Sequence, residues 1–240
     1  MNDRFYLESV DTLVAITTFK RKALLKYILR DLNKAQKLPT WIFNDDTEDL
    51  SGYLFNLFDL YFSQILYKKI DLVARQRCDL QKLRAVKEFL KSSYSYLLLL
   101  DDDIILDPNW LNKARIWYED YKLPISLFNH PHHQIFRVQE FEEVRIHSQM
   151  SGPAVFFSRL EAERIIDFYL SKDDLYISRG SGWDWAFASI LGNQVICPKQ
   201  SYAEQIPSKG INKHTWSYNP TDYLFHWKTI FKPNLVLEEI

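Results

Sequence analysis

Apolar and polar residues follow a repeating order along the chain, in which short aliphatic runs are followed by amphipathic segments. The first run, Thr12 to Phe19, predicts a strand, and segment 20–36 carries leucine and isoleucine at helical spacing. Pro39 ends this predicted helix, and the run 40–44, which leads into an acidic turn, predicts a second strand. A strand followed by a helix and another strand is the beginning of an α/β fold.

The aliphatic window from Leu97 to Leu106, with the sequence LLLLDDDIIL, predicts a strand buried on both faces of a largely parallel sheet. Segment 79–93 before it predicts an amphipathic helix with Asp79 as its N-cap. Three consecutive acids, Asp101 to Asp103, follow the first four leucines. They therefore fall at the carboxyl end of a strand, where ligands bind in open α/β sheets.

The remaining elements are less regular. Segment 51–73 is aromatic, and we expect a helix with a short strand before Asp71. Later elements are predicted, in chain order, as a helix from the N-cap Asp107 to about Tyr121, a strand at 124–129, antiparallel strands within 135–149, a strand at 152–157, a helix from Ser158 with Glu161 in its first turn, a polar loop, a helix at 186–191 and a strand at 194–198.

Composition narrows the class of protein. With 240 residues, 47% of them hydrophobic, the chain suits one globular domain, and a formal charge of -1 does not mark a nucleic-acid-binding protein. Cys78 and Cys197 are too few for a disulfide framework. The amino terminus has no signal-peptide pattern, and no apolar run reaches the roughly 18 to 20 residues of a spanning helix. We expect a cytoplasmic protein, either free or peripheral at the inner membrane face.

Two clusters of residues are candidates for chemistry. Adjacent carboxylates such as Asp101 to Asp103 repel one another, and a cation bridging them to an anionic ligand would hold them ionised. The alternative is that they only terminate a strand and face water. The second cluster is GSGWDW at 180–185, where two glycines permit close approach of the backbone to a ligand and Asp184 opens a helix. The alternative there is a plain helix cap.

The order of these motifs resembles that of GT-A glycosyltransferases, in particular bacterial enzymes of glycosyltransferase family 2. The matching segments are TLVAITTFKR, IFNDDTED, DLQKLRAVKEFL, LLLLDDDIIL, GPAVFFSR and GSGWDWAF. The resemblance implies a single GT-A domain with a Rossmann-like nucleotide-sugar-binding sheet flanked by helices and a small antiparallel extension on the acceptor side. Residues 1–107 would form the nucleotide-binding half, and residues 108–240 the acceptor-binding half and a carboxyl-terminal loop.

The resemblance also implies a reaction. Family members transfer a sugar from a nucleoside diphosphate sugar, here expected to be a UDP-sugar, to a hydroxyl of a glycan, glycolipid or glycoprotein, and inversion is preferred over retention. Mn²⁺ or Mg²⁺ would assist the departing diphosphate as a Lewis acid. Asp184 would be the general base, with Trp183 and Trp185 contacting the acceptor. The family commonly has two adjacent acids where this chain has Trp183 and Asp184. Asp184 is therefore the single candidate for the general base at this position.

For the donor, the resemblance implies contacts from the first loop, the second strand and the acidic motif. The residues concerned are Thr17, Phe19, Arg21, Asp45, Arg84, Asp101 and Asp102. Asn44 takes the place of Asp45 if the match is shifted by one residue. Lys82 competes with Arg84 for the position that faces the nucleotide and the acids. The alternative for each is a side chain at a strand end, in a turn or on a helix with no ligand.

The metal site that the resemblance implies combines Asp103 with a later residue. Asp103 would coordinate the ion, and Asp101 would approach the ribose or a metal-bound water. His214 lies where many GT-A enzymes place a late ligand on a flexible loop, and Lys209 and Lys213 would help to hold the diphosphate there. A surface histidine is the alternative.

Three other functions are compatible with parts of the sequence. A haloacid-dehalogenase-type phosphatase also has D-x-D after an apolar strand, but here Ile104 and Ile105 replace the expected D-x-D-x-T pattern. A nucleotidyltransferase would share the sheet and the acids, yet the glycine-rich phosphate loop after the first strand is missing. A non-catalytic carbohydrate-binding protein would explain the seven tryptophans but not the acids together with GSGWDW.

Overall fold

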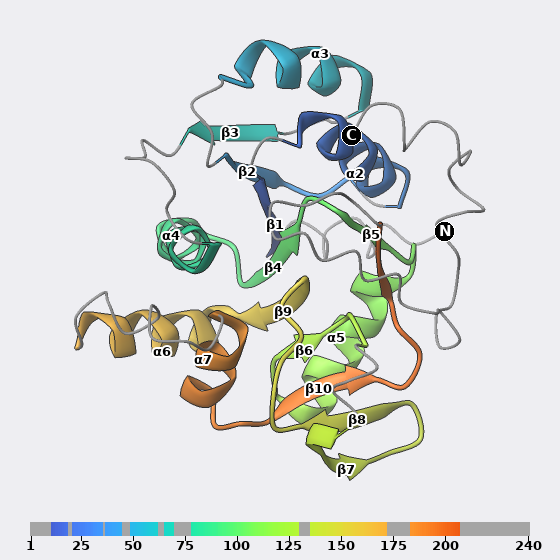
Figure 1. Cartoon of the computed structure of the whole chain (residues 1–240), viewed down its shortest axis with the longest axis vertical. Helices are drawn as coiled ribbons and strands as arrows, with labels where there is room; N and C mark the ends of the chain where they lie inside the picture. The colour runs from blue at the N-terminus through green and yellow to red at the C-terminus, as the bar shows by residue number, and fades with distance from the viewer. Residues whose placement is uncertain are drawn as a thin grey trace.

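The computed structural model describes residues 11–18, 21–35, 37–44, 49–61, 65–69, 78–129, 135–171 and 183–206. Its centre is a nine-stranded mixed sheet (Figure 1). The strands lie in the order β3 (Ile65–Lys69), β2 (Thr40–Asn44), β1 (Thr12–Thr18), β4 (Tyr96–Asp101), β9 (Ala154–Ser158), β6 (Ile125–Ser126), β10 (Val195–Pro198), β8 (Val144–His147) and β7 (Arg137–Glu140). The strands from β3 to β4 are mutually parallel, whereas β9 runs antiparallel to both β4 and β6.

Two further strands lie outside the large sheet. The strand β5 (Ile104–Leu106) pairs antiparallel with β11 (Ala203–Gln205) in a two-stranded sheet of their own. At the far edge of the large sheet, β7 and β8 form an antiparallel pair with a register shift between Arg137 and Gln139. The chain therefore combines a parallel half with an antiparallel extension, and this α/β architecture confirms the predicted fold class.

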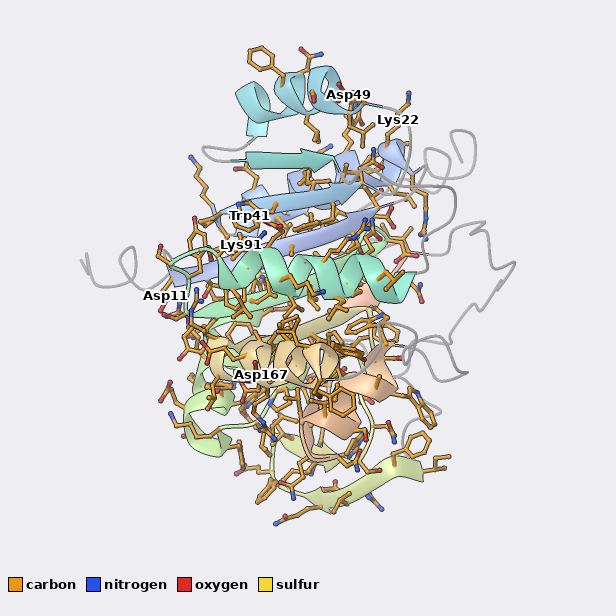
Figure 2. All side chains as sticks on the ribbon, turned by 90° about the vertical axis from the view of Figure 1, so that its left-hand side faces the viewer. Asp11, Lys22, Trp41, Asp49, Lys91 and Asp167 are labelled. Atoms are coloured by element: carbon orange, nitrogen blue, oxygen red, sulfur yellow. The ribbon has the colours of Figure 1, made fainter. Side chains whose placement is uncertain are left out.

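Helices cover both faces of the sheet (Figure 1). One face carries α2 (Lys22–Ala35) and α5 (Trp110–Tyr121), with α3 (Ser51–Tyr61) beside α2. The other face carries α4 (Cys78–Leu90), α6 (Arg159–Leu170) and α7 (Trp183–Ile190). Figure 2 looks onto this second face, where α4 and α6 lie side by side. No helix among the described residues is long and apolar enough to cross a membrane.

The two hydrophobic cores follow from the alternation of side chains along β1. Leu13 and Ala15 pack into the core under α4, α6 and α7, whereas Val14 and Ile16 pack into the core under α2 and α5. Successive side chains of a strand point to opposite faces, so a strand covered on both sides is apolar throughout. All seven residues of β1 are accordingly buried.

Several predicted details are confirmed. Segment 51–73 contains a helix and then a short strand, and 135–149 contains the antiparallel pair. The helix after β9 begins with the predicted capping box, in which the Ser158 N–H donates to Glu161 Oε2 at 2.8 Å. Cys197 is buried, as expected for a small residue that fills the core.

Several predicted boundaries are wrong. The helix expected at 186–191 is α7, which begins at Trp183, three residues earlier. The aliphatic window is two strands rather than one, because the chain turns at residues 102–103 between β4 and β5. The helix expected from Asp107 begins at Trp110, and Asp107 Oδ1 instead accepts the N–H of Asn109 at 2.8 Å within the preceding turn. The helix expected from Asp79 begins at Cys78, so Asp79 is part of its first turn rather than its N-cap.

Candidate functional site

The carboxyl ends of β1, β2 and β4 meet at one edge of the sheet. The parallel register sets Thr17 beside Asp101 and Thr18 beside Asn44. Thr17 Oγ1 donates to Asp101 Oδ1 at 3.4 Å, and Thr18 Oγ1 donates to Asp102 Oδ2 at 2.5 Å. The structure therefore brings Thr17, the predicted site residue of β1, next to the acidic motif. Thr18 was not singled out from the sequence, although it follows a predicted contact directly.

The three carboxyl groups of the motif differ in their exposure to water. The side chains of Asp102 and Asp103 are 3% and 6% exposed, whereas that of Asp101 is 28% exposed. Burial raises the pKa of Asp102 to about 7 against the lowering effect of Arg21, and Asp103 raises it further. Burial also raises the pKa of Asp103, again opposed by Arg21. The ionised forms of this pair therefore depend on nearby cations.

Two cations face the acids from different elements. Arg21, just before α2, has Nη1 2.8 Å from Asp103 Oδ2 and 3.2 Å from Asp102 Oδ1. Lys82, on α4, has Nζ 2.5 Å from Asp101 Oδ1, and its side chain is fully buried. Among the described residues, three carboxylates face two cations, which leaves one negative charge in excess when all of these groups are ionised. The cluster is therefore suited to attract a further cation.

Helix α4 contributes two buried polar side chains to this edge. Gln81 Nε2 donates to backbone carbonyl oxygens at the ends of β2 and β1, at 2.7 and 3.2 Å, and so ties these strand ends together. Lys82 lies four residues before Val86, so both side chains are on the buried face of the helix. A lysine among the apolar positions of a helix is a pattern in the sequence that can indicate a buried ion pair. The Arg84 Nη1 atom has no hydrogen-bond partner within the described residues, so the predicted donor contact of Arg84 stays a prediction.

The first turn of α7 packs against the segment that precedes β9. A Cβ atom on Gly152 would lie 2.9 Å from Trp183 Cζ2 and 3.2 Å from both Cβ and Oδ2 of Asp184. Trp183 is only 6% exposed, and Lys82 Nζ lies 5.1 Å from the centroid of its ring. Trp185 is 38% exposed. Of the two predicted acceptor tryptophans, Trp183 therefore supports the site from inside and Trp185 faces outward.

Asp184 has the electrostatic character of a group that can exchange a proton near neutral pH. Desolvation raises its pKa to about 6, against the lowering effect of backbone hydrogen bonds, and the charge of Asp101 raises it further. One of these bonds runs from the Trp185 N–H to Asp184 Oδ1 at 3.0 Å. A general base works best when its pKa lies near the operating pH. Asp184 therefore meets the electrostatic requirement for the predicted role, which itself stays a prediction.

The chain returns to the acidic motif after β10. The Ile206 N–H donates to the carbonyl oxygen of Asp103 at 2.7 Å, and Gln205 Nε2 donates to Asp103 Oδ2 at 3.1 Å. These contacts were missed from the sequence, because the three-residue strand β11 has no measurable hydrophobic period of its own. They fix the backbone of the turn that carries Asp103.

The chemistry of the acids fits a hard divalent ion. Carboxylate oxygens are the ligands that Mn²⁺ and Mg²⁺ prefer, and a bound cation would favour the ionised forms of Asp102 and Asp103. Within the described part of the chain, however, no three histidine, cysteine or acidic side chains are grouped as a complete metal site. Five residues named in the sequence analysis lie outside the described residues, so their predicted contacts stay predictions: Phe19, Asp45, Gly180, Lys209 and His214.

The tight contact at Gly152 gives a first testable prediction. Gly152→Ala should lower the free energy of unfolding by about 1 to 3 kcal/mol, because its methyl group would overlap Trp183 and displace α7. Gly52→Ala in α3 is the matched control, since a Cβ there meets nothing within 4 Å. The control should be neutral or stabilising by up to about 1 kcal/mol. Urea unfolding of both variants measures the difference, and equal stability would refute the tight packing.

Comparison with known proteins identifies the fold. No protein-family model matches the chain, and no curated protein matches its sequence. Among solved structures, S. aureus TarS 1-349 matches with a TM-score of 0.58 and 12% identity over 81% of this chain. Mannosyltransferase PcManGT from Pyrobaculum calidifontis, in complex with GDP-Man and Mn²⁺, matches with a TM-score of 0.60 and 15% identity over 83%. GalNAc-T7 with UDP, GalNAc and Mn²⁺ matches with a TM-score of 0.60 and 10% identity over 82% of this chain.

These likenesses, at 15% identity or less, show a common fold. The chain has the fold of GT-A-type glycosyltransferases, as the order of its motifs predicted. It spans 60% of the TarS chain, 58% of the PcManGT chain and 43% of the GalNAc-T7 chain.

Proposed function

We propose that this chain transfers a sugar from a nucleoside diphosphate sugar, with a UDP-sugar as the first candidate, to a hydroxyl of a glycan, glycolipid or glycoprotein. The observation that carries the proposal is the position of Asp184 at the carboxyl edge of a GT-A-type sheet. It packs against Gly152, whose neighbour Pro153 accepts the N–H of Asp101, and the charge of Asp101 contributes to its raised pKa of about 6. Neighbouring structures that contain GDP-Man or UDP together with Mn²⁺ support this donor class.

On the donor side, the residues at the ends of β1 and β4 would hold the nucleotide. Asp103, with Asp101 beside it, would bind Mn²⁺ or Mg²⁺, which when bound supplies Lewis-acid stabilisation to the diphosphate leaving group. The Arg21 side chain is 30% exposed, so its guanidinium can donate to a phosphate oxygen while it remains near the acids. Thr17 and Asp101, which are joined by a hydrogen bond, would contact the ribose of the nucleotide. Phe19, Asp45, Asp102, Arg84 and His214 complete the proposed donor and metal site.

On the acceptor side, Asp184 would remove the proton from the attacking hydroxyl. The hydroxyl oxygen then forms a bond to the anomeric carbon of the donor sugar, while the bond from that carbon to the diphosphate oxygen breaks and the nucleoside diphosphate leaves with the electron pair. One base beside the donor site favours direct displacement, which inverts the anomeric configuration. Trp183 holds the turn that carries Asp184, and Trp185 faces the acceptor.

Donor binding tests this proposal. Isothermal titration with UDP and GDP in the presence of Mn²⁺ should show binding that weakens by about 10- to 100-fold in Asp103→Ala, since charge-assisted contacts contribute about 1.5 to 3 kcal/mol. The control is Asp120→Ala, which removes an exposed carboxylate on α5. Circular dichroism should show both variants folded. Equal nucleotide affinity in Asp103→Ala and the unaltered protein would remove Asp103 from the donor site.

The competing functions predict different products. A phosphatase would release phosphate from simple monoesters through an aspartyl-phosphate on Asp101, and this release would disappear in Asp101→Asn. A transferase releases nucleoside diphosphate when an acceptor is present and leaves simple monoesters intact. A non-catalytic carbohydrate-binding protein would bind saccharides with no affinity for nucleotides. Product analysis with one nucleotide sugar and one phosphomonoester therefore separates the three.

A further inference from the structure

An aromatic surface lies next to Asp184, and two segments that are distant in sequence form it. Trp185 follows Asp184 in α7 and is 38% exposed. Phe136, just before β7, meets it edge to face, with ring centroids 5.3 Å apart and ring planes at 84°. Ile135 and Val138, beside Phe136 in the chain, are 81% and 63% exposed. An exposed indole therefore follows the proposed base directly, and Phe136 connects it to the exposed aliphatic residues at the start of β7.

Both rings are carried by hydrogen-bonded backbone. The backbone N–H of Trp185 donates to Asp184 Oδ1, so the Asp184 carboxylate is held against the backbone from which the Trp185 indole projects. The carbonyl oxygen of Phe136 accepts hydrogen bonds from the N–H and Oγ of Ser148, at 2.9 and 3.3 Å, which tie this segment to the end of β8. A surface held in this way loses little conformational entropy when a ligand binds.

The polar groups around the rings indicate the kind of ligand. Arg137 and Glu140, with side chains 51% and 37% exposed, stand on β7 beside the apolar residues, and their ion pair is 2.6 Å long. A lipid chain binds in a continuous apolar groove. Covering the charged groups of Arg137 and Glu140 with a lipid chain would remove them from water, which is unfavourable. A sugar ring has one face of C–H groups that packs on an indole and a rim of hydroxyls that binds charged and amide groups. The mixed surface therefore suits a saccharide.

We propose that Trp185 and Phe136 bind the terminal sugar ring of a saccharide acceptor and present one of its hydroxyls to Asp184. Trp185 directly follows Asp184 in the first turn of α7, so a sugar ring stacked on the indole would lie next to the turn that carries the Asp184 carboxylate. The acceptor is accordingly an existing glycan, free or attached to a carrier, rather than an amino-acid side chain. This inference rests on the proposed function, because it takes Asp184 as the base.

The test measures saccharide binding and nucleotide binding on the same variants. Saturation-transfer NMR with soluble oligosaccharides of glucose, mannose and N-acetylglucosamine should detect binding to the full chain. Trp185→Ala and Phe136→Ala should each weaken it by about 3- to 10-fold, and Trp185→Phe should restore part of the loss. Phe55→Ala, which removes a 65% exposed ring from α3, is the matched control and should have no effect. UDP affinity should be the same in all four variants.

Other results overturn the inference. If no saccharide binds, or if binding is unchanged in Trp185→Ala and Phe136→Ala, these rings are not an acceptor site. Binding of an unglycosylated peptide or of phosphatidylglycerol vesicles that depends on these rings would assign the surface to a different ligand, such as a peptide strand added at the β7 edge. If saccharides bind through both rings while neither UDP nor GDP binds, the transferase proposal fails and the carbohydrate site remains.

Discussion

Asp184→Asn is expected to lower turnover by about 10² to 10⁴-fold while nucleotide affinity stays unchanged. A positioned carboxylate contributes roughly this factor when it accepts a proton from the attacking hydroxyl, and an amide of the same shape cannot accept it. Asp184 lies beside Gly152 and Trp183, not on the strand that carries the acidic motif, so its replacement leaves the donor contacts in place. The measurements are the rate of nucleoside diphosphate release with acceptor present and UDP affinity by calorimetry.

The pH dependence of the rate supplies an independent measurement on the same group. Desolvation raises the pKa of Asp184 to about 6, and only the deprotonated carboxylate can act as a base. Turnover of the unaltered chain should therefore fall as the pH is lowered through about 6, and level off above about 7. The step near pH 6 should be missing from the residual rate of Asp184→Asn, whereas any step near pH 7 that comes from Asp102 should remain. Asp167→Asn on α6 (Figure 2), an exposed acid away from the motif, is the control that should keep the full profile.

A structural role for Asp184 predicts the opposite pattern. An acid in the first turn of a helix stabilises it by about 0.3 to 1 kcal/mol through the helix dipole, and asparagine keeps most of the hydrogen bonding there. Near-normal turnover in Asp184→Asn, with a slightly lower melting temperature, would leave Asp184 as a residue of the helix start alone. Unchanged stability with a large loss of rate supports the base.

Local patterns were enough to predict most elements of the fold and one side of the site. The alternation of strand and helix, the capping box at Ser158 and the placement of Asp101 to Asp103 after a buried strand all depend on residues close in sequence. Parallel strands also align their carboxyl ends at one edge of a sheet. This rule brings Thr17 to Asp101, as the register confirms.

The rest depends on contacts between distant segments, which periodicity does not record. Gln205 reaches Asp103 from a strand of three residues, and Phe136 reaches Trp185 across 49 positions of the printed sequence. The predicted single strand of LLLLDDDIIL failed for a related reason: β5 pairs with β11 and not with the large sheet. The aliphatic residues of LLLLDDDIIL would be buried in one continuous strand and are buried in the two observed strands. Hydrophobicity alone therefore could not distinguish one strand from two.

Lys82→Met is expected to lower the free energy of unfolding by about 1.5 to 3 kcal/mol, because it leaves the Asp101 carboxylate without its buried ion-pair partner. Lys82 is fully buried and forms the ion pair with Asp101, and methionine fills a similar volume without the charge. Its loss leaves Asp101 to Asp103 with Arg21 as their cation among the described residues, and so increases the repulsion within the motif. Urea unfolding at pH 7 measures the change.

A double-mutant cycle shows whether the loss comes from this ion pair. Because Lys82→Met removes the partner of Asp101, adding Asp101→Asn to it should cost less than Asp101→Asn alone, with a coupling energy of about 0.5 to 3 kcal/mol. Lys91→Met, directly after α4 (Figure 2), removes a lysine that is 70% exposed and should change stability by less than about 0.5 kcal/mol. Strictly additive effects of Lys82→Met and Asp101→Asn would mean that the buried lysine acts only through packing, against Trp183 in particular, and not as the cation of the acidic motif.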